Sequence, residues 1–209
     1  MQEIIYWFKW LFSKTLPAGS VLGIPLRVHL LTVIFLGIIG IPMILGFGNP
    51  LFGLIYFVLF FSLLYGSILA HEFGHAWGNR LVGGGTDQII MTPIGGIAMG
   101  YGSDSSPKTE LIVVGLGPAV TVVFAVIGFV LNWGLGTIGL ENYMPPVVAF
   151  TILGAVQLFY IINLYLGIFN LFTPIFPLDS AKLIRAALSL KFNPQLVTLR
   201  LTQFGIAFA

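Results

Sequence analysis

The sequence contains no cysteine among its 209 residues. Disulfide bridges and thiolate metal sites are therefore excluded, and any bound metal must be held by histidine and carboxylate side chains. Histidine is itself scarce, with 3 in the whole chain, and the acidic residues number 7. A metal site can therefore be sought among very few side chains.

Charge is the second shortage. Only 8% of the residues are charged, 57% are hydrophobic, and the mean hydropathy is +1.01. Because soluble domains are usually about a quarter charged, this composition predicts an integral membrane protein whose surroundings are the lipid bilayer. The net charge of +2 gives no reason to expect a nucleic-acid partner. The length predicts a single membrane-embedded domain over residues 1–209, with its core at about 51–190.

Long apolar runs separated by turn residues predict an all-α polytopic membrane protein with about five to six transmembrane helices. A span needs about 20 apolar residues to cross the hydrocarbon layer. The predicted spans are residues 30–47, 51–81, 109–133 and 147–172. The third of these, 109–133, is expected to be interrupted by GLGP at 115–118. A further apolar helix is predicted at 195–209, where it stops abruptly. We therefore expect the C-terminal helix to be truncated.

Two kinds of segment lie outside these spans. Residues 1–16 are apolar and aromatic with interspersed lysines, which predicts either an interfacial helix or an extension of the next segment. The stretches GSVLGIPLRVHL and QIIMTPIGGIAMGYG (88–102) contain strand-favouring residues, or Gly and Pro where a helix would not place them. They predict short membrane-associated β-strands or a re-entrant loop near the cytoplasmic side.

The basic residues predict the orientation. Lysine and arginine are absent from the loops 46–50 and 134–146, and they cluster at Lys9, Lys14, Arg27, Arg80, Lys108, Lys182, Arg185 and Lys191. By the positive-inside rule, the N-terminus, the 83–108 segment and the 173–194 segment all face the cytoplasm, and the membrane is expected to be the cell membrane.

The HEFGH motif at residues 71–75 lies near the end of the second predicted span. On a helix, His71 and His75 are four residues apart, so both imidazoles project from one face and can bind one ion. Glu72 lies beside them, where it can take a proton from a metal-bound water. The alternative is that the histidines cap a helix and bond to the backbone.

A catalytic zinc ion usually takes a third protein ligand and leaves one position open. The remaining histidine, His29, precedes the first span, where a bond to the backbone is the simpler reading. The candidates are therefore acidic residues: Asp87, Asp104, Glu110, Glu141 and Asp179. Asp179 follows PIFPL at the start of a predicted helix, on the same side of the membrane as HEFGH. We favour it as the third ligand, the alternative being an N-cap.

The sequence resembles the site-2 protease family of intramembrane zinc metalloproteases. The matching segments are GIPLRVH (23–29), HEFGH (71–75), MTPIGGIAMG (91–100), PKTELIVVGLGPAV (107–120) and NLFTPIFPLDSAKLIRA (170–186). The resemblance implies that His71, His75 and Asp179 bind zinc and that Glu72 is the general base. It implies that Asn170 polarises the scissile carbonyl, although here three residues separate Asn170 from Pro174 and Ser180 replaces the usual glycine.

The resemblance also implies a substrate class. The expected reaction is hydrolysis of a peptide bond in or near the transmembrane segment of a protein, such as an anti-sigma factor or a membrane-tethered transcription regulator, in regulated intramembrane proteolysis. An unwound substrate needs hydrogen-bond partners at membrane depth, and the segment at Ile94, Gly95 and Gly96 could supply them by strand addition. The alternative is a re-entrant hairpin that only packs.

Two other functions stay open. A membrane metalloprotease of the prenyl-processing sort also carries HExxH, but it needs a downstream glutamate ligand, for which Glu110 and Glu141 are the candidates. A non-catalytic metal-binding membrane protein or transporter would use the metal structurally, and such sites usually have four protein ligands.

Overall fold

The computed structural model describes residues 13–208, so the expected interfacial helix over residues 1–16 lies largely outside the described residues. A small β-sheet and a set of helices follow in chain order. They are β1 (Thr15–Val21), β2 (Ile24–His29), α2 (Leu30–Gly46), α3 (Pro50–Leu81), β3 (Gly85–Thr92), β4 (Gly95–Tyr101), α4 (Pro107–Ile138), the 3-10 turn η1 (Leu140–Asn142), α5 (Pro146–Phe172), α6 (Asp179–Ser189) and α7 (Pro194–Phe208).

The long helices are those that the hydropathy predicted. Within residues 13–208, α3, α4 and α5 are long and apolar enough to cross a membrane, and α2 is a shorter apolar helix of 17 residues. The chain is therefore a mostly helical integral membrane protein with a small sheet. The expected count of five to six spans is not confirmed, because α2 and the 15-residue α7 are shorter than a typical span.

The helix starts follow from local sequence. Asn49 caps α3 by accepting a hydrogen bond from the backbone N–H of Leu51 at 2.9 Å, and Pro50 occupies the first turn. Ser106 caps α4 in the same way through the N–H of Thr109 at 3.2 Å. The expected interruption of the third span at GLGP is absent, because α4 continues through Pro118.

The sheet has the strand order β1-β2-β3-β4. Strands β1 and β2 form an antiparallel pair, as do β3 and β4, whereas β2 and β3 run parallel with Leu26 opposite Ile89. The apolar face of the sheet packs against α3. The core consists of Ile24, Leu26, Ile68, Ala76, Ile89 and Met91. The predicted strands therefore form one sheet that lies beside the helix carrying HEFGH.

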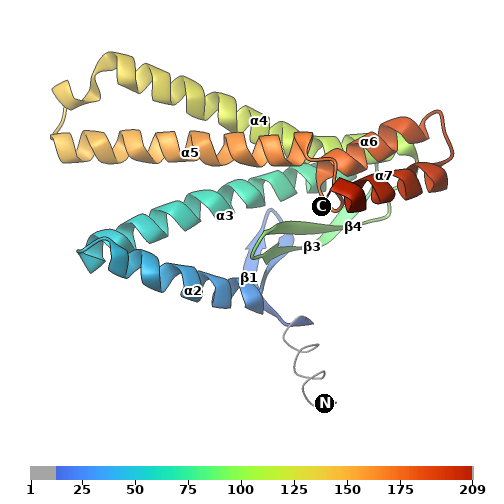
Figure 1. Cartoon of the computed structure of the whole chain (residues 1–209), viewed down its shortest axis with the longest axis horizontal. Coiled ribbons are helices and arrows are strands. Elements are labelled where there is room, and N and C mark those ends of the chain that lie inside the picture. Colours follow the sequence, from blue (N-terminus) through green and yellow to red (C-terminus); the bar gives the residue numbers. More distant parts are fainter. Residues whose placement is uncertain (1–12, 209) are drawn as a thin grey trace, which may run out of the picture.

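The helices form two hairpins, α2–α3 and α4–α5, whose turns lie at the same end of the long axis (Figure 1). The sheet, α6 and α7 lie at the other end. Helix α3 contacts both the sheet and α4, and α4 contacts α6. The C-terminal half of α3 thus lies between the sheet and α4.

Candidate metal centre

The crossing of α3 and α4 brings two backbones into close contact. Gly74 and Gly78 of α3 face α4, and a Cβ atom added at Gly78 would lie 2.8 Å from the Val113 Cα atom. A Cβ atom at Gly74 would likewise lie 2.9 Å from the Gly117 Cα atom. Small residues four apart allow this approach between membrane helices. The histidines of HEFGH therefore lie directly against α4.

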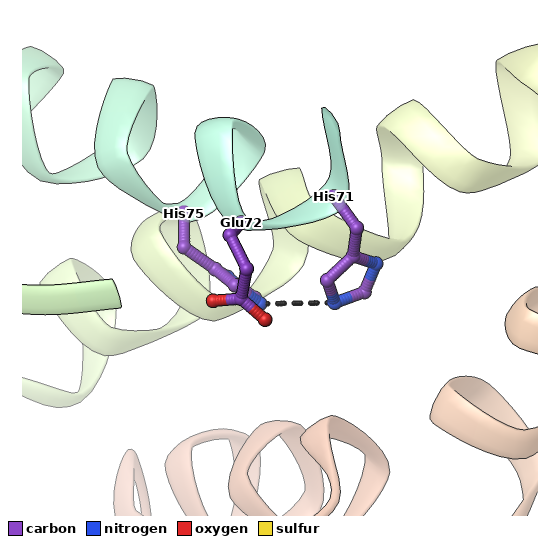
Figure 2. Close-up of side chains that lie close together, drawn as sticks. All are labelled: His71, Glu72 and His75. Carbon is purple, nitrogen blue, oxygen red and sulfur yellow. Dashed lines mark hydrogen bonds between the residues drawn. The ribbon is translucent and has the colours of Figure 1, made fainter. Parts of the chain in front are cut away.

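The two histidines point into one space. In Figure 2 the side chains of His71, Glu72 and His75 all project to the same side of α3. The Nε2 atoms of His71 and His75 are 3.1 Å apart, and one ligand atom from each of the three residues lies within 4.8 Å of the others. His71 and Glu72 are buried, and His75 is partly buried.

Asp179 completes the cluster from α6. Its Oδ2 atom lies 2.9 Å from the His71 Nε2 atom and 3.1 Å from the His75 Nε2 atom, and the residue is 4% exposed. Leu178 occupies the N-cap position of α6, so Asp179 is the first helical residue and its carboxylate turns toward the histidines. The structure therefore brings together the three side chains expected to bind metal.

Asp179 is held in its ionised form. Burial alone would raise the pKa of the Asp179 carboxyl, but the neighbouring imidazoles of His71 and His75 and the ammonium of Lys182 hold that pKa well below its usual range. The Lys182 Nζ atom donates to Asp179 Oδ1 at 3.1 Å, which leaves Oδ2 for the histidine side. A buried carboxylate of this kind is available as a ligand.

The hydrogen bonds on the far sides of the rings show whether a metal fits. The Nδ1 atom of His75 lies 2.9 Å from the carbonyl oxygen of Val113, which can only accept, so Nδ1 carries the proton of the neutral ring. The Nε2 lone pair of His75 then faces the Asp179 carboxylate. Two facing electron-pair donors about 3 Å apart repel unless a proton or a metal ion lies between them, so the same atoms that share a proton with Asp179 can instead bind a metal ion. Two imidazoles and one carboxylate form a donor set that suits zinc.

Glu72 is bound on the other side of the cluster. Its Oε2 atom accepts a hydrogen bond from the backbone N–H of Ala98 in β4 at 2.9 Å. Gly96 packs against the Glu72 side chain so closely that a Cβ atom there would clash with it. Glu72 therefore lies between the histidines and strand β4.

Of the other predicted site residues, Gly96 lies against Glu72, whereas Asn170 and Ile94 have other surroundings. The Asn170 Nδ2 atom donates to the Leu166 carbonyl oxygen within α5 at 3.0 Å. Ser180, which replaces the family glycine, donates from Oγ to the carbonyl oxygen of Thr173. Ile94 is 95% exposed at the turn between β3 and β4, and Gly95 and Gly96 begin β4.

The alternative ligands have other surroundings. Glu110 pairs with Arg185, Glu141 lies in η1, and both Asp87 and Asp104 are exposed. His29 caps α2, because its Nδ1 atom accepts from the N–H of Leu31 at 3.2 Å. That bond to the backbone is the one expected from the sequence.

Two contacts to the histidines were not predicted from the sequence. The Val113 carbonyl oxygen contacts His75, and the Thr121 hydroxyl lies 2.8 Å from the His71 Nδ1 atom. A backbone carbonyl leaves no signal in a sequence. Thr121 did leave one, because it is a lone polar side chain in an apolar stretch.

The chain is similar in sequence to several named proteins. Zinc metalloprotease MJ0392 of Methanocaldococcus jannaschii is 31% identical over 176 residues, which are 83% of this chain and 45% of that protein. Putative zinc metalloprotease Rip3 of Mycobacterium tuberculosis is 28% identical over 88% of this chain and 38% of its own length. Putative zinc metalloprotease sll0528 of Synechocystis is 29% identical over 83% of this chain and 44% of its own length. The chain thus spans less than half the length of these relatives.

The fold is similar to a solved structure. The Site-2 Protease from Methanocaldococcus jannaschii superimposes with a TM-score of 0.63 and 24% sequence identity, covering 93% of this chain and 81% of that one. No family model matches the chain.

Proposed function

Because the chain belongs to the site-2 protease family of zinc metalloproteases, we propose that it is a zinc-dependent endopeptidase that hydrolyses a peptide bond in or near a transmembrane segment. The single observation that carries this proposal is the meeting of His71, His75 and Asp179, with Glu72 alongside. Their chemistry is that of a metal-assisted hydrolase.

The zinc ligands are His71 Nε2, His75 Nε2 and Asp179 Oδ2. When bound there, zinc supplies Lewis acidity, which polarises a carbonyl oxygen and makes water more acidic. The protein fixes the three ligand atoms through Val113 on His75, Thr121 on His71 and Lys182 on Asp179. Three protein ligands leave a position for water or substrate, as a catalytic site requires.

Glu72 acts as the general base. Its Oε1 atom is not used in the bond to Ala98, so it can accept the proton of the attacking water and pass it to the departing amine. The N–H of Ala98 holds the carboxylate at the edge of β4 and fixes its direction. Positioning of a carboxylate by a backbone donor is the arrangement that general-base catalysis needs.

Strand β4 offers an edge for the substrate. It is the last strand of the sheet, and it lies next to Glu72. An unwound substrate segment could add to this edge and have its backbone groups satisfied there. We assign Ile94, Gly95 and Gly96 to this binding role, with Ile94 exposed for side-chain contact.

Asn170 is assigned the role of donating to the scissile carbonyl. Its amide now donates to the Leu166 carbonyl within α5, so this role requires the side chain to rotate.

The biological process that we assign to the chain is regulated intramembrane proteolysis of an anti-sigma factor or a membrane-tethered transcription regulator, at the cytoplasmic side of the cell membrane. The basic residues around the sheet and α6 favour this orientation.

The test is cleavage of a reporter protein with one transmembrane segment by the purified full chain in detergent or vesicles. Glu72→Gln should lower the cleavage rate by about 10²- to 10⁴-fold, because loss of a general base has that cost. It should retain zinc, since its carboxylate is not a ligand. Asp87→Asn, an exposed acid on β3, is the matched control and should cleave normally. Unchanged cleavage by Glu72→Gln would rule out the proposed mechanism.

A further inference from the structure

Helix α4 contacts both histidines of the candidate metal site and also the helix that carries Asp179. The Val113 carbonyl accepts from His75, the Thr121 hydroxyl contacts His71, and Glu110 pairs with Arg185 on the helix that carries Asp179. Of these three contacts, the one from Thr121 is made by a fully buried side chain, since Thr121 is 1% exposed. It is therefore the contact that water could least easily replace.

The hydroxyl hydrogen of Thr121 has an acceptor within its own helix. The Thr121 Oγ1 atom lies 3.4 Å from the carbonyl oxygen of Gly117, one turn earlier. A hydroxyl that donates to this carbonyl turns its lone pairs toward the Nδ1 atom of His71, 2.8 Å away. The Nδ1 atom then carries the ring proton and donates, so the Nε2 atom presents a lone pair to Asp179 and His75.

The rest of the Thr121 side chain fits a defined space. Its methyl Cγ2 atom lies beside Gly167 of α5, 3.8 Å from where a Cβ atom of that residue would be. His71 itself is 5% exposed, so its ring is enclosed between α3, α4 and α6. A valine at position 121 has the shape of threonine and would fill the same space without the hydroxyl.

We propose that Thr121 is a positioning residue that fixes the tautomer and the rotation of the His71 ring for metal binding. The proposal rests on the zinc-binding part of the proposed function and not on its protease part. Partners of this kind, on the far nitrogen of a ligating histidine, orient the ring and increase its basicity. Thr121 touches neither the substrate nor the metal, and it acts through His71.

The experiment measures zinc affinity of the full chain in detergent by competition with a chromophoric chelator. Thr121→Val should bind zinc about 10- to 100-fold more weakly, which is the usual effect of removing such a partner. Thr121→Ser keeps the hydroxyl and should bind like the wild type. Thr121→Ala removes the hydroxyl with less bulk and should lose affinity as the valine variant does. The visible spectrum of bound Co²⁺ provides a second readout, which should change in the two variants without the hydroxyl.

Thr151→Val is the matched control, because Thr151 is an exposed residue of α5 whose hydroxyl bonds to the Val147 carbonyl at 2.7 Å. It should leave the affinity unchanged. Wild-type affinity in Thr121→Val, or equal losses in the serine and valine variants, would overturn the proposal. A wild-type chain that binds zinc but cleaves no substrate would remove the protease assignment alone. A wild-type chain that binds no zinc would remove both.

Discussion

At the residue scale, the site depends on side chains that are distant in the sequence. Asp179 follows His71 by 108 residues, yet the Asp179 Oδ2 and His71 Nε2 atoms are 2.9 Å apart. Lys182 holds the second carboxylate oxygen, and it belongs to the same helix as Asp179. The orientation of this one carboxylate therefore decides whether three ligand atoms or two are available.

Asp179→Asn should consequently lower zinc affinity by at least about 100-fold, because a neutral amide oxygen is a far poorer ligand than a carboxylate. Zinc per purified chain, measured by atomic absorption after dialysis, checks this. Glu110→Gln is the informative comparison and should retain zinc, since Glu110 pairs with Arg185. Loss of zinc in Glu110→Gln with retention in Asp179→Asn would instead favour the prenyl-processing type of site.

Which side chains lie together at the site could be predicted largely from the sequence. The spacing of His71 and His75 indicated a shared helix face, and Asp179 was selected by its place after PIFPL. The direction of a side chain could not be read. Asn170 donates within its own helix, and Thr121 points at His71, because helix rotation is set by packing that the sequence does not state.

At the element scale, the contact between α3 and α4 controls the position of both histidines. It depends on Gly78 and Gly74, where the two backbones touch. Gly78 lies against Val113, the residue whose carbonyl holds His75. A displacement of α4 would therefore disturb the packing of α3 on α4 and shift the His75 ring.

Gly78→Ala should destabilise the protein by about 1–3 kcal/mol, the usual cost of overpacking. The thermal unfolding midpoint in detergent measures this, and zinc affinity should fall with it. Gly66→Ala, also on α3 but facing open space, is the control. It should be neutral or slightly stabilising, because alanine is the better helix former. A higher midpoint for Gly78→Ala would contradict the tight crossing.

The elements themselves were predicted well where the hydropathy was strong. The helices α3 and α5 match the predicted spans 51–81 and 147–172. The predicted break at GLGP was wrong, since α4 passes through Pro118. In a membrane, neighbouring helices and hydroxyl side chains can satisfy the backbone groups that a proline frees, so the local rule for soluble helices does not hold there.

At the scale of the whole molecule, the absence of cysteine gives a clean background for labelling. Single cysteines at Ser20, Ser105 and Asn142 lie at exposed positions. Cysteines at positions 20 and 105 should react with a membrane-impermeant thiol reagent from one side, and a cysteine at position 142 from the other. The spanning helix α4 lies between Ser105 and Asn142, and Ser20 belongs to the sheet whose last strand precedes Ser105. In intact cells only Asn142→Cys should react if the basic residues face the cytoplasm. Labelling of Ser20 and Ser105 from opposite sides would refute this arrangement.

The parallel pairing of β2 with β3 has a consequence for how the chain enters the membrane. Arg27 lies opposite Ile90, although the whole α2–α3 hairpin separates these strands along the chain. Since paired strands share one side of the bilayer, α2 and α3 must together return the chain to the side it left. Strands β2 and β3 can pair only after both helices are inserted, because β3 follows α2 and α3 in the chain. Pairing of β2 with β3 therefore excludes a chain in which only one of α2 and α3 has crossed the bilayer, because the two strands would then lie on opposite sides.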